Sequence, residues 1–330
     1  MALLRVEGVK KYFPVQKGIV SQLFTREKKF VRAVDGVSFE IERGEILGLV
    51  GESGSGKTTL GRLCVNLIQP TSGKILFDGI DLSQLKGEQL RLIRRRVQFT
   101  FQDPTSSLNP RMTIGDAVAD ALKLQGIGTR EEQRKRAEEM LELVGLAPAN
   151  SFYDRPPHQL SGGQKQRVVF ARAMALRPEF VVTDEPVAMV DVSMKAQILD
   201  LMLELKKQFN LTYLFISHDL ATARHVCDRI AVMYLGKIAE IADRNRIYED
   251  PLHPYSQGLM RAIPVPDPKA KRTEPVPRGE IPSPIDPPTG CRFHPRCPKA
   301  FEPCSRVEPQ LLALEGNRYV ACHLYGGPAT

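Results

Sequence analysis

Residues Gly51 to Thr59 read Gly-Glu-Ser-Gly-Ser-Gly-Lys-Thr-Thr and carry the strongest chemical signal in the sequence. A Gly-x-x-x-x-Gly-Lys-Thr spacing predicts a phosphate-binding loop, because the glycines let backbone N–H groups curl around a triphosphate. The apolar run 46–50 and the segment 60–65 predict the strand and helix that flank such a loop. Lys57 would reach the β- and γ-phosphates, and Thr58 would ligate Mg²⁺. The residues expected to hold the nucleotide are Ser53, Gly54, Ser55, Gly56, Lys57, Thr58 and Thr59.

A second glycine-rich helix start lies about a hundred residues downstream, at Leu160-Ser161-Gly162-Gly163-Gln164. Helix N-termini attract anions, so this segment predicts a second anion-binding end. One fold rarely needs two such ends for one triphosphate. Two copies of the chain placed head to tail would use both, each supplying one end to each nucleotide.

Polar residues that suit phosphoryl transfer follow two predicted strands. Asp184 and Glu185 follow the strand 180–183, and His218 follows the strand 213–217. Phosphoryl transfer needs neutralised charge and a positioned water, which Lys57, Mg²⁺, Glu185 and His218 can supply. The alternative for Glu185 is a solvated strand-end carboxylate, and for His218 a surface histidine.

The elements that must position these residues alternate between strands and helices. Strands are predicted at 4–13, 31–41, 74–79 and 97–101 in addition to those above, and a helix at 193–209. This order implies a mostly parallel sheet covered on both faces. A helical region begins near residue 103 and ends near 177. Within it, Thr129-Arg130-Glu131-Glu132 is a capping box, and one apolar stripe follows at Ala137, Met140, Leu141 and Val144.

The last part of the chain has a different composition. A hairpin predicted at 229–241 closes the first domain, and nine prolines then fall between Pro264 and Pro288. They predict a linker or an irregular tail. Across all 330 residues no apolar run approaches the roughly 18 to 20 residues that span a bilayer, and the N-terminus lacks a secretory segment, so we expect a cytoplasmic protein. The formal charge of +8 fits a nucleic-acid surface, an anionic membrane or an ordinary solvated surface.

With these motifs, the chain resembles the nucleotide-binding subunit of ABC transporters. The resemblance rests on Leu-Ser-Gly-Gly-Gln at 160–164, the phosphate-binding loop upstream and Asp184-Glu185 downstream. It implies an α/β P-loop NTPase fold with a RecA-like core, an antiparallel β subdomain, a helical signature subdomain and an irregular, cysteine-containing C-terminal extension. The expected domains are 1–260, with the helical subdomain at about 103–177, and the extension 261–330.

The resemblance also assigns roles to single residues. Gln102 becomes the Q-loop glutamine that contacts Mg²⁺ and the attacking water, and Asp184 the Walker B aspartate on Mg²⁺. Glu185 becomes the general base, and His218 the switch histidine at the γ-phosphate. The remaining nucleotide-site residues are Ser161, Gly162, Gly163 and Gln164 of the signature, Asp191 of the D-loop, and Phe13 as the adenine-stacking aromatic.

Two of these positions carry a qualification. Tyr12 is the alternative adenine platform, and both aromatics could instead pack against the sheet. The family's usual Ser-Ala-Leu-Asp reads Ala188-Met189-Val190-Asp191, so the serine hydroxyl is missing while every hydrolytic group is kept. This departure would therefore alter communication across the interface between the two ATPase subunits.

Further segments narrow the resemblance to the oligopeptide/dipeptide importer ATPases, and to the second of their two ATPase subunits. They are Tyr12-Phe13-Pro14-Val15 with its basic insertion, Phe101 to Pro104 leading to Ser107 to Arg111, Pro251 to Tyr255, and Gly290 to Pro298. The family implies a heterodimer with a second homologous ATPase, two transmembrane permease subunits and an extracytoplasmic solute-binding protein, at the cytoplasmic face of the membrane. Peptides are the expected cargo, with oligosaccharides or metal chelates open.

The six cysteines fall into two groups. Cys64 and Cys227 lie in apolar contexts that predict core positions. The other four are separated by five, six and seventeen residues, a spacing that suits zinc poorly but would allow an iron–sulfur cluster. Similar tails in the family imply a structural [4Fe–4S] cluster, with zinc or an empty reduced tail as alternatives and His294 and His323 as bystanders. The four are Cys291, Cys297, Cys304 and Cys322.

Two other classes of function remain as alternatives. A soluble ABC ATPase acting on nucleic acid or ribosomes usually has two cassettes or a long coiled-coil insertion, and this chain shows neither. A non-enzymatic binding module is disfavoured because every hydrolytic position is filled. We therefore expect an ATP-hydrolysing transporter subunit that uses ATP and Mg²⁺ and binds no nucleic acid.

Overall fold

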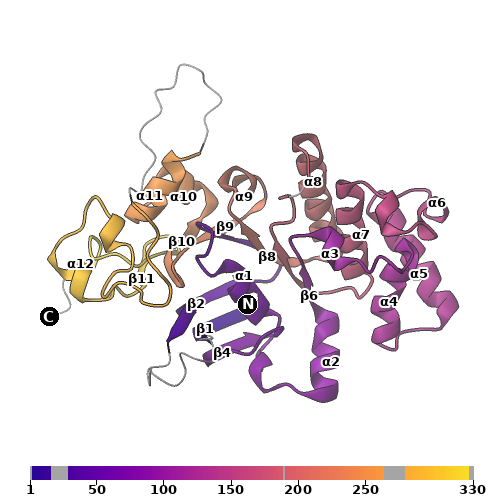
Figure 1. Ribbon diagram of the computed structural model, residues 1–330, viewed down its shortest axis with the longest axis horizontal. Coiled ribbons are helices and arrows are strands. Elements are labelled where there is room, and N and C mark those ends of the chain that lie inside the picture. Colours follow the sequence, from indigo (N-terminus) through magenta and orange to yellow (C-terminus); the bar gives the residue numbers. More distant parts are fainter. Residues whose placement is uncertain (1, 16–28, 189, 264–278, 327–330) are drawn as a thin grey trace, which may run out of the picture. The chain divides into compact units, whose positions relative to one another are not determined.

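The computed structural model describes residues 2–15, 29–188, 190–263 and 279–326. Most of the predicted basic insertion between Pro14 and Lys29, and the part of the proline-rich stretch at 264–278, lie outside these ranges. The chain forms two compact units (Figure 1). The first contains Met1–Leu3, Ile41–Ile46 and Gln84–Ile216, and the second contains Leu4–Glu40, Leu47–Ser83 and Ser217–Thr330. Among the described helices, none has the length and apolar content needed to cross a membrane.

The first unit is built on parallel strands. Strand β7 (Phe180–Asp184) lies between β6 (Val97–Thr100) and β8 (Thr212–Ser217), with Val97 opposite Phe180 and Phe180 opposite Thr212. Every residue of β7 and β8 is buried, as expected for strands covered on both faces. The strands predicted for these segments are confirmed.

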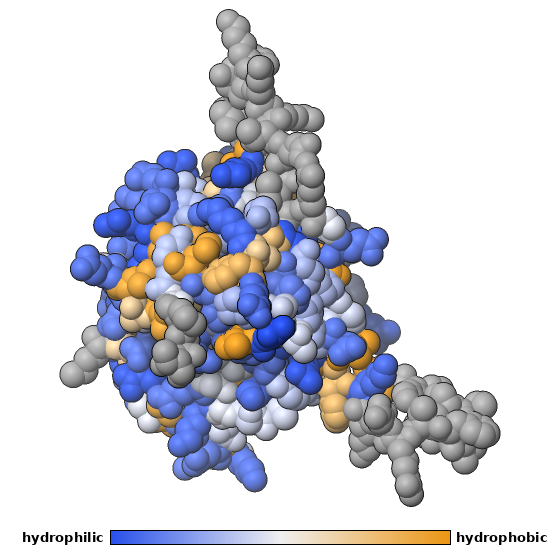
Figure 2. Space-filling view, turned by 90° about the vertical axis from the view of Figure 1, so that its left-hand side faces the viewer, coloured by the Kyte–Doolittle hydropathy of each residue, from blue (hydrophilic) through white to orange (hydrophobic). Residues whose placement is uncertain are grey.

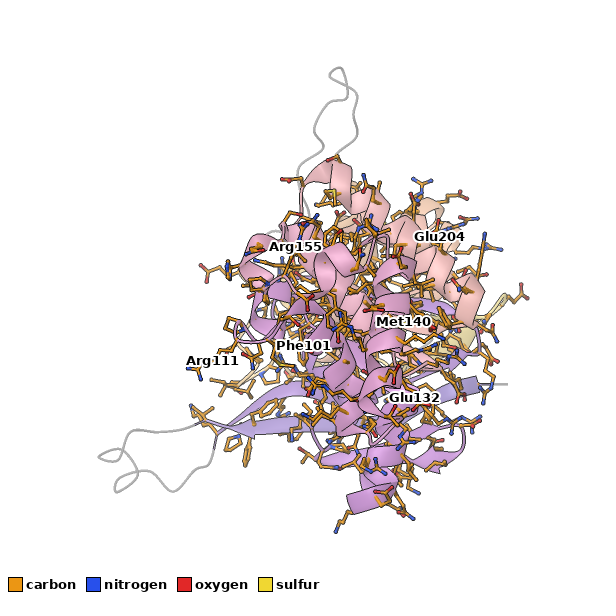
Figure 3. The ribbon with its side chains drawn as sticks, turned by 90° about the vertical axis from the view of Figure 1, so that its right-hand side faces the viewer. Phe101, Arg111, Glu132, Met140, Arg155 and Glu204 are labelled. Carbon is orange, nitrogen blue, oxygen red and sulfur yellow. The ribbon has the colours of Figure 1, made fainter. Side chains whose placement is uncertain are left out.

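The helices of the first unit confirm the helical pattern predicted after residue 103. The hydroxyl oxygen of Thr129 accepts a hydrogen bond from the N–H of Glu132, and the Glu132 carboxylate accepts one from the N–H of Thr129, so the capping box is formed. Figure 3 shows Met140 among the packed helices, whereas Arg111 and Arg155 lie at the surface. The helices are α2 (Gly87–Arg96), α3 (Pro104–Ser107), α4 (Ile114–Leu124), α5 (Arg130–Leu143), α6 (Asn150–Tyr153), α7 (Gly162–Met174) and α8 (Val192–Phe209).

The second unit contains an antiparallel sheet of four strands. The strand order is β2 (Phe30–Glu42), β1 (Ala2–Pro14), β4 (Ser72–Phe77) and β5 (Ile80–Asp81). Buried and exposed residues alternate along β2 from Val37 onward, because one face of the strand lies on the core and the other faces solvent.

A second set of strands in this unit supports the phosphate-binding loop. Strand β3 (Ile46–Val50) runs parallel to β9 (Arg229–Tyr234), and β3 leads through the loop into α1 (Lys57–Cys64). Strand β10 (Lys237–Asp243) pairs antiparallel with β9, which confirms the predicted hairpin and its turn at Leu235–Gly236. The helices after β8 are α9 (Leu220–Val226), α10 (Arg244–Glu249), α11 (Pro254–Arg261) and α12 (Glu302–Arg306).

The C-terminal extension is irregular at 279–293 but is built onto this sheet further on. Strand β12 (Arg318–Val320) pairs antiparallel with β10, and β11 (Leu312–Leu314) pairs with β12. Arg318 on β12 lies 3.1 Å from the carboxylate of Glu240 on β10, and the Glu240 side chain is fully buried. The same carboxylate accepts the backbone N–H groups of Leu252 and His253. A buried charge therefore anchors the extension to the core.

We expect Arg318→Met to lower the free energy of unfolding by about 3 kcal/mol, because the substitution leaves the buried Glu240 charge without its main partner. Urea unfolding of the full chain, followed by far-UV circular dichroism, measures the change. Arg306→Met is the matched control, since the pair of Arg306 with Glu302 is exposed, with side-chain accessibilities of 74% and 75%, and its loss should leave the midpoint unchanged. Equal midpoints for the two variants would contradict this account of the anchor.

Candidate active site

The phosphate-binding loop is tightly enclosed by backbone from neighbouring strands of the second unit. Gly56 has φ 105°, and a Cβ atom there would lie 2.1 Å from the carbonyl oxygen of Ala33 on β2. At Gly51 a Cβ would lie 2.1 Å from the carbonyl oxygen of Met233 on β9. Only glycine fits at either position, so the glycines of the motif are required by close packing as well as by the expected ligand.

Lys57 is held with its ammonium group inside this loop. It is buried, and Nζ donates hydrogen bonds to the carbonyl oxygens of Gly51 at 2.7 Å and Glu52 at 2.9 Å. Helix α1 begins at Lys57 without a side-chain cap and without an acidic residue in its first turn. The ammonium group and the positive end of the helix therefore lie together, an arrangement that suits a phosphate group.

Two candidate catalytic residues meet in the first unit. Gln102 donates from Nε2 to Oε2 of Glu185 at 2.8 Å, although 82 residues separate them. Glu185 has φ 48°, and its N–H donates to the carbonyl oxygen of Ile216 on β8. A non-glycine residue with positive φ is strained by about 1 to 3 kcal/mol, and such residues gather at functional sites. Asp184, directly before it, is buried at the end of β7.

The signature segment forms the N-terminus of α7, also in the first unit. Ser161 caps the helix by accepting the N–H of Gln164 at 3.3 Å, and the Gln164 side chain accepts the N–H of Ser161 at 3.0 Å. Ser161 and Gly162 are exposed, whereas Gly163 is buried against Met194. This is the second exposed helix start that the sequence predicts.

Asp191 is the last predicted nucleotide-site residue of the first unit. It is exposed and precedes α8, and its side chain makes no capping bond to that helix. Met189, part of the departure from the family's D-loop sequence, lies outside the described residues. The role given to Asp191 stays a prediction.

The two aromatic candidates near the N-terminus differ in their surroundings. The hydroxyl of Tyr12 donates to Oδ1 of Asp35 at 2.5 Å, and burial together with this carboxylate raises the pKa of Tyr12 to about 12. Phe13 is 38% exposed, with the ammonium of Lys11 5.1 Å from its ring centre. Phe13 thus has an accessible ring, and its adenine-stacking role stays a prediction. His218 is also exposed, directly after β8.

The four tail cysteines come together although they are widely spaced in the sequence. Cys291, Cys297, Cys304 and Cys322 all line one hollow. Burial, with a smaller effect from the neighbouring thiols, raises the pKa of Cys291 to about 11. Within the described residues, however, no group of three or more His, Cys, Asp or Glu side chains is spaced to hold a single metal ion. The iron–sulfur cluster therefore stays a prediction.

His294 and His323, the two expected bystanders, also line this hollow, and their role stays a prediction. A ring nitrogen of His294 lies 2.9 Å from the carbonyl oxygen of Cys291, and one of His323 lies 2.8 Å from that of Val307. Cys64 and Cys227 are buried core residues, as predicted. Figure 2 faces the side that carries the extension and shows apolar patches among hydrophilic residues.

Sequence reasoning missed one residue of the phosphate-binding loop, Glu52, and two residues that contact it, Tyr255 and Arg296. Glu52 lies inside the loop motif, at a position where the motif accepts any residue. Its N–H donates to the hydroxyl of Tyr255 at 2.9 Å, and its carboxylate accepts two bonds from Arg296. Tyr255 and Arg296 both lie in segments that the resemblance singled out. For Arg296 the available signal was a charged residue between Cys291 and Cys297.

The sequence matches two families along its length. Residues 34–188 match the family described as ABC transporter, and residues 239–304 match the C-terminal region of oligopeptide/dipeptide transporters. The chain is 48% identical over 326 residues to the oligopeptide transport ATP-binding protein AppF of Bacillus subtilis, covering 98% of this chain and 97% of that one. It is 47% identical over 320 residues to a putative peptide import ATP-binding protein of Brucella ovis, covering 97% of each chain.

Solved structures give the same class. The dimeric post-hydrolysis structure of the ATP-binding cassette MJ0796 bound to ADP and Pi aligns with a TM-score of 0.63 at 30% identity, covering 73% of this chain and 98% of that one. The cbiO1 structure from Clostridium perfringens aligns with a TM-score of 0.63 at 26% identity, covering 76% and 91%. The fold and the loops described above are those of an ABC-type ATPase. The chain belongs to the family of ATP-binding subunits of oligopeptide/dipeptide ABC transporters.

The strain at Glu185 gives a stability prediction. We expect Glu185→Gly to be more stable than Glu185→Ala by up to about 1 kcal/mol, because both variants lose the carboxylate while only glycine relieves the positive φ. Thermal unfolding of the two full-length variants measures the difference. An alanine variant as stable as the glycine variant would show that the backbone here is unstrained.

Proposed function

We propose that this chain binds and hydrolyses ATP to power an ABC importer for oligopeptides or dipeptides. The observation that carries the proposal is the similarity to peptide-transport ATP-binding proteins over nearly the whole chain, including the C-terminal region typical of these transporters. Within the chain we divide the protein into an ATPase domain, residues 1–260 with a helical subdomain at about 103–177, and an extension, residues 261–330.

In the proposed reaction Lys57 and the N-terminus of α1 bind the β- and γ-phosphates. Thr58, Asp184 and Gln102 would hold Mg²⁺, which when bound neutralises charge that develops on the phosphoryl oxygens. Glu185 accepts a proton from the attacking water, and its contact with Gln102 supports this role because the amide orients the carboxylate. His218 contacts the γ-phosphate, and Phe13 stacks on the adenine.

The exposed signature supports a two-subunit site. Ser161, Gly162, Gly163 and Gln164 of one ATPase subunit would face the nucleotide held by the loop of the other, with Asp191 near the contact. The dimeric cassette structure of MJ0796 is consistent with this arrangement. Because ATP would be bound fully only in the closed pair, its binding energy drives closure. We propose a second homologous ATPase as the partner.

Membrane partners follow from the same family membership. We propose that the two ATPase subunits dock on two transmembrane permease subunits at the cytoplasmic face of the membrane, and that an extracytoplasmic solute-binding protein delivers the peptide. Closure of the ATPase pair would then be transmitted to the permeases. Oligosaccharides are the alternative cargo for the same assembly.

The convergence of the four tail cysteines supports a bound [4Fe–4S] cluster in the extension. Cys291, Cys297, Cys304 and Cys322 would ligate it, since all four line one hollow and thiolates are the usual cluster ligands. When bound, the cluster would cross-link four segments of the extension. We propose a structural role because none of the proposed steps transfers an electron.

Glu185→Gln tests the hydrolytic role. The amide fills the space of the carboxylate but accepts no proton, so we expect ATP turnover by the assembled transporter to fall about a hundredfold or more while ATP binding is kept. The steady-state ATPase rate and the amount of ATP retained in the complex are the measurements. Wild-type turnover by this variant would contradict the assignment of Glu185.

Purification of the tagged chain from host membranes tests the transport role. We expect two permeases and a second ATPase to co-purify, and peptides to stimulate ATP hydrolysis by the complex. Stimulation of ATP hydrolysis by oligosaccharides but not by peptides would change the assigned cargo to oligosaccharides. Recovery of ribosomes or DNA without permeases would replace the transport assignment with a soluble ABC ATPase.

Anaerobic purification tests the cluster. We expect about four iron and four sulfide per chain with broad visible absorption, and loss of both in Cys297→Ser. Ser305→Ala is the matched control, since this serine is exposed on α12 and is no expected ligand. One zinc ion per chain, or no metal in a well-folded protein, would overturn the proposal that the four cysteines bind a [4Fe–4S] cluster.

A further inference from the structure

The extension reaches the phosphate-binding loop through one residue of that loop. Two guanidinium nitrogens of Arg296 donate to the two carboxylate oxygens of Glu52, at 2.7 Å and 3.0 Å. The Arg296 side chain is 6% exposed and that of Glu52 24%. A two-bond arginine–carboxylate pair fixes orientation as well as distance. The contact therefore constrains the conformation of Glu52.

Glu52 is also the residue that Lys57 and Tyr255 contact. The ammonium of Lys57 donates to the Glu52 carbonyl oxygen at 2.9 Å, and the Glu52 N–H donates to the Tyr255 hydroxyl at 2.9 Å. Thus the side chain, carbonyl and N–H of one residue are all held. A change in the conformation of Glu52 would displace the carbonyl that orients the phosphate-binding lysine.

Arg296 is itself rigidly placed. Its N–H donates to the carbonyl oxygen of Phe293, within a 3₁₀ turn at His294–Arg296. One guanidinium nitrogen lies 3.3 Å from the Tyr234 hydroxyl, and the group lies 5.7 Å from the Tyr234 ring centre. The Phe293 ring packs 5.3 Å from both Tyr234 and Tyr255. The arginine is thus fixed before it meets Glu52.

The same turn lies between two of the cysteines that line the hollow. Cys291 and Cys297 flank it, and the N–H of Cys291 donates to the carbonyl oxygen of Cys304 at 2.8 Å. Arg292, also within this segment, is paired with the buried carboxylate of Asp35. Both arginines point from the cysteine segment toward the part of the second unit that carries the phosphate-binding loop.

From these contacts we propose that Arg296 is a positioning residue for nucleotide binding: its pair with Glu52 holds the phosphate-binding loop in the conformation that accepts ATP. The cysteine segment of the extension is then a functional part of the nucleotide site. The proposal rests on the proposed function of the loop. Because the loop holds the phosphates in both ground and transition states, loss of the pair acts mainly on affinity.

The test measures ATP affinity of the full chain in the Glu185→Gln background, in which hydrolysis does not interfere. We expect Arg296→Gln and Glu52→Gln each to weaken ATP binding roughly tenfold, a change of about 1.4 kcal/mol. The double variant should be no weaker than either single variant, because both remove the same interaction. Arg296→Lys should recover only part of the affinity, since an ammonium does not reproduce the two-bond geometry.

Two further readouts separate positioning from general stability. In the assembled ATPase, Arg296→Gln should raise KM for ATP with kcat nearly unchanged. By reciprocal linkage, ATP should slow backbone hydrogen exchange at residues 291–297 in the Glu185→Gln protein but not when Arg296→Gln is added. Arg306→Gln is the matched control, since Arg306 is an exposed arginine of the same extension. This substitution should alter neither the KM for ATP nor the effect of ATP on hydrogen exchange.

The outcomes are distinguishable. A full chain that binds no ATP even with Arg296 intact overturns the proposed function. ATP binding by that chain with unchanged affinity in Arg296→Gln, or additive effects of the two single substitutions, overturns this inference alone. If Arg296→Gln fails to fold, the decision falls to Glu52→Gln, measured by ATP affinity and by hydrogen exchange at residues 291–297. The Glu52 side chain is partly exposed and glutamine has nearly its size, so this substitution opens no cavity.

Discussion

The phosphate-binding loop depends on close contact between backbone segments. The carbonyl oxygens of Ala33 on β2 and Met233 on β9 occupy the space that side chains at Gly56 and Gly51 would need. In addition, the N–H of Gly236, in the turn after β9, donates a hydrogen bond to the carbonyl oxygen of Ser55. Because packed backbone deforms less readily than side chains, the strands fix the loop, and the loop in turn fixes Lys57 and the start of α1.

Other groups proposed for the chemistry also lie at the ends of strands. Asp184 ends β7 and Glu185 follows it, and His218 follows β8, as the phosphate-binding loop follows β3. In parallel sheets the carboxyl ends of the strands carry the loops that bind ligands. The strained backbone at Glu185 shows that the positioning extends to a single residue, which the bond from its N–H to Ile216 and its contact with Gln102 maintain.

Charge pairs attach the extension to the rest of the second unit, together with the packing of Phe293 on Tyr234 and Tyr255 and the pairing of β12 with β10. Arg292 contacts Asp35, Arg296 contacts Glu52, and Arg318 contacts Glu240, and in each pair the arginine side chain is largely buried. The irregular segment 279–293 contains no helix or strand, so side-chain contacts such as that of Arg292 contribute much of its attachment. Arginine suits this role because its planar guanidinium matches the geometry of a carboxylate.

The sequence by itself determined the order of strands and helices, the phosphate-binding loop, the signature helix start and the capping box at Thr129. These features are local: they depend on periodicity, on glycine and on hydrogen bonds between residues three or four apart. Gln102 and Glu185 were assigned from the family, whereas their contact, and the positive φ of Glu185, were decided by the tertiary structure. So were the convergence of four widely spaced cysteines and the pairing of Arg296 with Glu52, 244 positions apart. Such contacts depend on how strands bring distant segments together, which no local pattern encodes.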